Sequence, residues 1–166
     1  MPTDGLSLDV VGRIVLSVLT VVFFALDAFA TIAELSFGDA SPTKLRYAAS
    51  TPGGRQALRL LADKKRTIST MRVLSIISQA ALSVMLFVLF ISSLSPLWLG
   101  IVTAGLVDVL TIVVFGEILP SALGVRRPER MASSLAFPVR LFYFLFYPLT
   151  SLTGFFTWFT EKTLQV

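Results

Sequence analysis

Three long apolar stretches constrain this sequence more than any other feature, and they lie at residues 14–33, 73–91 and 97–117. Each is close to the length of about 20 mainly apolar residues that a helix needs to cross a bilayer. Hydrophobic residues make up 55% of the 166-residue chain and charged residues 14%, against about 25% charged residues in an ordinary soluble domain. We therefore expect an all-α integral membrane protein, a single domain over residues 1–166 with three transmembrane helices.

The basic residues predict how the chain is oriented in the membrane. Most of them lie in two segments, residues 39–72 and 126–130, whereas the turn at residues 92–96 carries no charge. Because positive residues concentrate in cytoplasmic loops, we expect both basic segments inside and the N-terminus outside, in the plasma or inner membrane. The basic residues that give the net charge of +4 then orient the chain in the membrane and contact the lipid bilayer. No nucleic-acid partner is expected.

Two further segments predict amphipathic juxtamembrane helices on the cytoplasmic side, at about residues 41–66 and 130–162. Ser41-Pro42 is typical of a helix start, with a capping side chain followed by proline in the first turn. The short turn between the second and third stretches predicts that these two helices form an antiparallel hairpin.

The apolar run at residues 141–159 leaves a choice open, because hydropathy alone would make it a fourth span. Pro138 and Pro148 each remove a helical hydrogen bond, and Arg140 stands at the start of the run. The aromatic residues that crowd this segment favour the membrane interface. We therefore favour kinked helices embedded in the inner leaflet.

The residue types restrict the chemistry. The chain has no Cys and no His, which excludes thiolate and imidazole catalysis and the soft-metal sites that those side chains form. We expect no enzyme, since no nucleophile–base pair is visible. Carboxylates inside the membrane are costly and are functional hypotheses by default, and here they are Asp27, Glu34, Asp108 and Glu117.

Polar side chains form stripes on the first two predicted spans. Asp27, Thr31 and Glu34 follow helical spacing and share one face. On the second span, Ser75 and Gln79 are four residues apart, with Ser78 beside them. Single hydroxyls in such helices usually bond to their own backbone or to a neighbouring helix, and Glu34 has the alternative of reaching water at the cytoplasmic boundary. Together the two stripes predict an oxygen-rich cluster.

The segment from Gly116 to Pro120 predicts a cation site. Pro120 has no N–H, so in a regular α-helix the carbonyl of Gly116 loses its partner, and an unpaired carbonyl at membrane depth must find another. This carbonyl lies beside the carboxylate of Glu117. Carboxylates, carbonyls and hydroxyls are the ligands of hard cations such as Mg²⁺. For Asp108, pairing with a polar group on a neighbouring helix is the favoured interpretation, ahead of a role in an aspartyl protease.

Three segments resemble the transmembrane domain of the CNNM/CorC magnesium transporters: residues 116–120 (GEILP), 124–132 (GVRRPERMA) and 145–149 (LFYPL). Residues 31–36 (TIAELS) are similar to the family's Ser-x-x-Glu-x-Ala element. The resemblance covers nearly the whole chain. It implies a homodimer with three spans per chain, and full-length members continue into cytoplasmic CBS domains that bind ATP, so we expect this chain to be the membrane domain alone.

The resemblance also implies a set of metal ligands. Gly116 would offer its carbonyl and Glu117 its carboxylate, and Thr31 would stand where the family has a serine ligand. The family commonly has asparagines at the positions matching Leu74-Ser75 and Gln79, so Ser75, Ser78 or Gln79 would supply that oxygen here. The leading hypothesis is magnesium transport, with exchange against sodium as one form of it. The alternative is a membrane-embedded magnesium sensor that regulates a partner.

Overall fold

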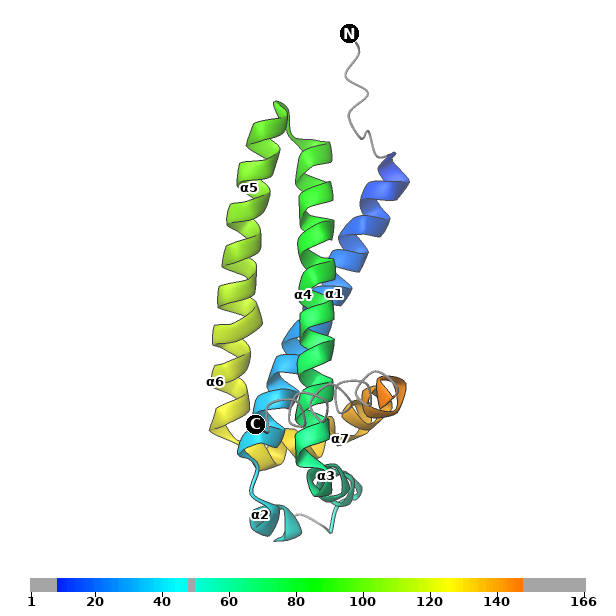
Figure 1. Ribbon diagram of the computed structural model, residues 1–166, viewed down its shortest axis with the longest axis vertical. Coiled ribbons are helices and arrows are strands. Elements are labelled where there is room, and N and C mark those ends of the chain that lie inside the picture. Colours follow the sequence, from blue (N-terminus) through cyan, green and yellow to red (C-terminus); the bar gives the residue numbers. More distant parts are fainter. Residues whose placement is uncertain (1–8, 48–49, 148–166) are drawn as a thin grey trace, which may run out of the picture. The chain divides into compact units, whose positions relative to one another are not determined.

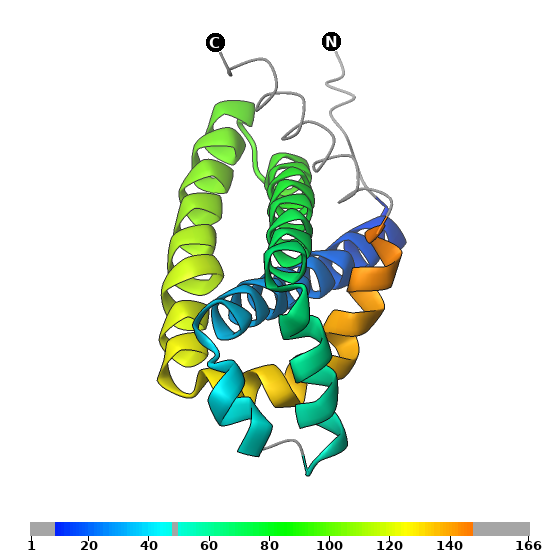
Figure 2. The same ribbon diagram turned by 60° about the horizontal axis from the view of Figure 1, so that its bottom comes forward.

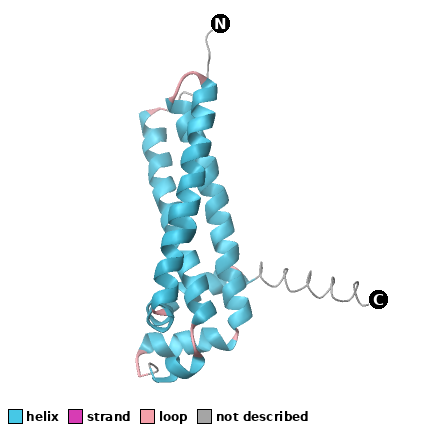
Figure 3. Ribbon diagram, turned by 90° about the vertical axis from the view of Figure 1, so that its left-hand side faces the viewer, coloured by secondary structure: helices cyan, strands magenta, loops and turns pink. Residues whose placement is uncertain are grey.

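The computed structural model describes residues 9–47 and 50–147, and every regular element within them is a helix (Figure 3). This confirms the predicted all-α class. The helices are α1 (Val10–Asp39), α2 (Pro42–Tyr47), α3 (Pro52–Ala62), α4 (Lys64–Ser93), α5 (Leu97–Leu110), the π-helix η1 (Thr111–Ile118), α6 (Leu119–Arg126) and α7 (Pro128–Leu145).

Three helical runs are long and apolar enough to cross a membrane: α1, α4, and the continuous run of α5, η1 and α6. Each has 30 residues, which corresponds to about 45 Å of helix at 1.5 Å per residue, against about 30 Å for the hydrocarbon core. The three predicted spans are therefore confirmed. Each helix extends beyond the predicted bounds, because apolar residues mark only the part that matches hydrocarbon.

The chain divides into two compact units, one with residues 1–31 and 74–123 and the other with residues 32–73 and 124–166. We call them the first and the second unit and describe each by itself.

The first unit contains the predicted hairpin of α4 and α5 together with the first part of α1 (Figure 1). Small residues let the two helices of the hairpin approach closely: a Cβ on Gly100 would lie 3.1 Å from Ile91 Cα, and Ala104 is fully buried. Phe24 of α1 packs edge-on against Phe115 of η1, with ring centroids 5.6 Å apart. Apolar side chains over much of α1 and α5 remain exposed, as expected of helices that contact lipid.

The second unit is built around α3 and α7, which pack against each other (Figure 2). Helix α3 begins as the sequence suggests, because Pro52 opens its first turn and the Thr51 side chain accepts a hydrogen bond from Gly54 N–H at 3.1 Å. The apolar faces of the two helices bury Ala57, Ala136 and Val139. Helix α2 begins at Pro42, as predicted.

Charged and aromatic side chains also join the elements of the second unit. Tyr143 on α7 donates a hydrogen bond to Asp63 Oδ2 at 2.9 Å, and the guanidinium of Arg66 lies 4.0 Å from the ring centroid of Tyr147. Burial raises the pKa of the Tyr143 hydroxyl, and the bond to Asp63 acts in the same direction. Lys44 of α2 pairs with Glu129 of α7 at 3.4 Å.

The juxtamembrane bounds need correction. The predicted helical segment at residues 41–66 ends at Ala62, and α4 begins at Lys64, so the basic residues 64–72 belong to the helix of the second span. Helix α7 starts at Pro128 and continues through Pro138. The remainder of the predicted segment 130–162, and most of the run at 141–159 considered as a fourth span, lie outside the described residues.

Candidate cation site

The third span changes its hydrogen-bonding register where the sequence predicts the site. Residues Thr111–Ile118 form a π-helix, and the N–H of Leu119 bonds to the carbonyl of Val114, five residues back. Such π-segments inside α-helices occur frequently at functional sites. The sequence predicts a regular α-helix over these residues, and that prediction is wrong.

The register change and Pro120 together reduce the backbone donors available to the nearby carbonyls. α-Helical bonding resumes with α6 at Leu119, so the carbonyls of Phe115, Gly116 and Glu117 lie between the two registers. Pro120 has no N–H, so it offers no donor to the carbonyls of Phe115 and Gly116, which lie five and four residues before it. The Ser121 hydroxyl donates to the carbonyl of Glu117. The predicted position, Gly116, and its neighbour Phe115 thus each lack a donor that another residue at position 120 would provide.

Gly116 packs directly against a carboxylate of the first span. Gly116 is buried, and a Cβ built on it would lie 2.9 Å from Asp27 Oδ2 and 3.7 Å from Gln79 Nε2. A side chain at this position would therefore displace Asp27. The glycine allows the backbone of η1 to approach side chains from α1 and α4.

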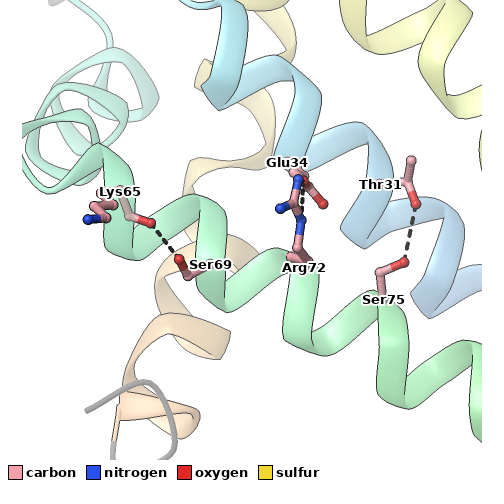
Figure 4. Close-up of polar contacts among 6 residues, drawn as sticks. All are labelled: Thr31, Glu34, Lys65, Ser69, Arg72 and Ser75. Carbon is pink, nitrogen blue, oxygen red and sulfur yellow. Dashed lines mark hydrogen bonds and ion pairs between the residues drawn. The ribbon is translucent and has the colours of Figure 1, made fainter. Parts of the chain in front are cut away.

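Asp27 connects the polar stripes of α1 and α4. Only 2% of Asp27 is exposed, and its Oδ1 accepts a hydrogen bond from the Ser75 hydroxyl at 2.6 Å. The side chain of Gln79 also interacts with this carboxylate. The hydroxyls of Thr31 and Ser75 lie 3.5 Å apart (Figure 4). The structure therefore brings together four of the predicted polar positions with Gly116.

Glu117 follows Gly116 but has a different environment. Its side chain is exposed in this chain, and it is the next residue after Gly116, against which Asp27 packs. Within the described residues no group of three or more His, Cys, Asp or Glu side chains gathers. A hard cation here would therefore depend on carbonyl and hydroxyl oxygens as well as on these two carboxylates.

Glu34 makes a different contact from the one that its place in the stripe suggests. In the second unit its Oε1 accepts from Arg72 Nε at 2.9 Å and Nη2 at 2.7 Å (Figure 4). Both bonds go to one carboxylate oxygen, and the guanidinium balances the charge of Glu34. The role of Glu34 as a ligand stays a prediction.

Two further polar residues lie on the spanning helices of the first unit. Ser78 is fully buried, and its hydroxyl has no hydrogen-bond partner among the described residues. Asp108 accepts a hydrogen bond from the Ser83 hydroxyl at 3.0 Å, which confirms the predicted pairing with a neighbouring helix.

Asp27 is the residue whose place at the candidate site was not predicted from the sequence. It appeared there as one more intramembrane carboxylate, although it stands four residues before Thr31 on the same helix face. That spacing was the available signal. What the spacing could not indicate is that Gly116, almost 90 residues further along, would lie against it.

A family comparison bears directly on this geometry. The model of the cyclin M transmembrane N-terminal domain, CNNM, matches residues 18–166. The chain belongs to the CNNM transmembrane-domain family. The match begins within the first span and includes the other two spans and all of the segments that carry the resemblance in the sequence. No curated protein matches the chain.

Membership in the CNNM family fixes the broad class of function. The family is associated with magnesium transport and metal-ion homeostasis, and it is a transporter-type membrane domain rather than a known enzyme family. Together with the three apolar helices, this makes the chain a multi-pass membrane protein of ion transport.

Proposed function

We propose that this protein carries Mg²⁺ across the plasma membrane through a site formed around Gly116 and Glu117. The observation that supports the proposal best is the change of register in the third span. Together with Pro120, it reduces the backbone donors available to carbonyls that lie beside a carboxylate, within a helix long enough to cross the membrane. Freed carbonyls at interrupted helices coordinate cations in many transporters.

Thr31, Ser75 and Gln79 are the proposed side-chain contributors from the other two spans. Their oxygens are hard ligands, which suit Mg²⁺ and not a soft metal. Ser78 is a further candidate from the same unit. In this proposal the N-terminus is outside and the basic segments are cytoplasmic, the protein acts as a homodimer, and CBS domains follow in the full-length protein.

The exposure of Glu117 is compatible with a homodimer, since a carboxylate left open by one chain can be enclosed by a second copy. The small residues of the third span give the homodimer less support than their positions in the sequence suggest. Gly100 already packs against Ile91 of the same chain, and Ala104 is buried within that chain. The dimer therefore rests on the resemblance.

Flux into liposomes separates transport from the alternative, a sensor that acts on a partner. Liposomes containing only this protein and a magnesium-sensitive dye should show Mg²⁺ entry, and Glu117→Gln should abolish it. An imposed sodium gradient should change the rate if the two ions are exchanged. If the purified protein binds Mg²⁺ but no Mg²⁺ enters the liposomes, the sensor hypothesis replaces transport.

A further inference from the structure

Asp27 has no basic side chain close to it among the described residues of the first unit. Within its described residues, 9–31 and 74–123, the one basic side chain is Arg13. Arg13 precedes Asp27 by fourteen residues, about 21 Å along a helix, and its guanidinium donates to the carbonyl of Ser92 at 3.2 Å. The groups that act on Asp27 are Ser75, Gln79 and Glu117, and none of them is positively charged.

A buried carboxylate without a positive partner is costly, because burial removes the water that solvates its charge. Here the cost is increased by a second carboxylate nearby, since Glu117 directly follows Gly116, against which Asp27 packs. Protonation would remove one of the two charges, whereas a bound cation compensates both together. Two carboxylates match the charge of a divalent ion, whereas a monovalent ion would leave one negative charge uncompensated in low dielectric.

The geometry around Asp27 provides the remaining features of such a site. Ser75 holds Oδ1 at 2.6 Å, which leaves Oδ2 on the side of Gly116. There the carbonyls of Phe115 and Gly116 lie in the gap between the π and α registers, where Pro120 supplies no donor. The carboxylate and these carbonyls therefore belong to the same small region of the first unit.

We infer that Asp27 is a second carboxylate ligand of the cation site and that, with Glu117, it makes the site selective for divalent over monovalent cations. This inference rests on the proposed function, because it assigns a further residue to the same site. In the proposed site, Ser75 positions Asp27. Gly116 has no side chain, and this leaves room for the Asp27 carboxylate to contact the ion.

The test compares three matched substitutions in the whole chain. Asp27→Asn keeps the size of the side chain and its ability to bond to Ser75 while it removes the charge. Glu117→Gln makes the same change at the other carboxylate. Asp108→Asn is the control, because Asp108 is an intramembrane aspartate that bonds to Ser83 in the same unit. Calorimetry with MgCl₂ and with NaCl measures both affinities in detergent.

We expect Asp27→Asn to weaken Mg²⁺ binding at least tenfold and to reduce the preference for Mg²⁺ over Na⁺, with Asp108→Asn unchanged in both. If Asp27→Asn binds Mg²⁺ like the parent while Glu117→Gln does not, the proposed site stands and Asp27 is only structural. If the parent and Glu117→Gln bind Mg²⁺ alike, the proposed site itself is wrong.

A measurement on the unmodified chain avoids any effect of substitution on folding. A hydrophobic carbodiimide labels carboxyl groups inside membranes, and mass spectrometry locates the labelled residues. Mg²⁺ should slow labelling of both Asp27 and Glu117 and leave Asp108 unaffected. Protection of Glu117 without protection of Asp27 would overturn the inference.

Discussion

At the scale of single residues, the role of Pro120 comes from its missing backbone N–H, which cannot donate a hydrogen bond to a carbonyl of the preceding turn. Any other residue at this position would present an N–H to the carbonyls of Phe115 or Gly116. A carbonyl bonded in this way is a poorer ligand, because its oxygen is shared. Pro120 is also buried.

Pro120→Ala should therefore weaken Mg²⁺ binding several-fold without abolishing it. Alanine supplies the missing N–H, but the carboxylate of Glu117 remains. Mg²⁺ requires near-ideal octahedral geometry, so the partial loss of one carbonyl should be measurable by calorimetry. Glu117→Gln, which keeps the proline, should have the larger effect. Equal affinity of Pro120→Ala and the parent would show that the proline only shapes the chain.

The sequence predicted the site residues unevenly, for physical reasons. Gly116, Glu117 and Pro120 are adjacent in the chain, and the effect of proline on a carbonyl is local, so this part was predictable. The contact of Ser75 with Asp27 joins residues 48 positions apart and depends on helix packing. The capture of Glu34 by Arg72 depends on how far α4 extends before the apolar residues begin, which hydropathy does not indicate.

At the scale of elements, the hairpin of α4 and α5 shows what small residues do in a spanning helix. Lipid supplies no hydrophobic drive for association, so helices in membranes associate through close packing. On α5, Gly100 faces the backbone of α4, where a Cβ would lie 3.1 Å from Ile91 Cα and 3.2 Å from the carbonyl oxygen of Phe90. Gly105 has more space, with Phe87 Cζ at 3.9 Å.

Gly100→Ala should therefore destabilise the protein, by about 1–3 kcal/mol if it behaves like other overpacked sites. Backbone atoms cannot move aside as the end of a flexible side chain can. Gly105→Ala is the matched control and should be tolerated. Thermal unfolding of both variants in detergent provides the comparison. If the two variants unfold at the same temperature, the close contact at Gly100 does not stabilise the hairpin.

The elements themselves were the most predictable level of the fold. Length and hydropathy identified the three spans, and Ser41-Pro42 identified the start of α2. The π-helix was not predicted, because the sequence of residues 111–118 has no feature that distinguishes five-residue from four-residue bonding. Its position immediately before Pro120 suggests that the missing donor and the register change act together.

At the scale of the whole molecule, the proposed orientation follows from the distribution of basic residues. The turn between α4 and α5 is uncharged, whereas the basic segments flank the other ends of the spans. The prediction therefore puts Ser95 outside and Ser134 of α7 inside. Both residues are exposed in the structure, and the chain has no cysteine of its own.

Single-cysteine labelling tests this orientation directly. In intact cells, Ser95→Cys should react with a membrane-impermeant maleimide, and Ser134→Cys should react only after the membrane is opened. The cysteine-free parent is the control for background labelling. The reverse pattern would mean that the chain is inverted and that the positive residues do not determine its topology.

The central claim is that one Mg²⁺ binds at the junction of η1 and α6. Crystals grown with manganese in place of magnesium would locate the ion by its anomalous signal. The account predicts a peak at coordination distance, about 2 Å, from the carboxylate of Glu117 and the carbonyl of Gly116, and it predicts no peak in crystals of Glu117→Gln. A peak elsewhere in the spans, with none at this junction, would contradict the account.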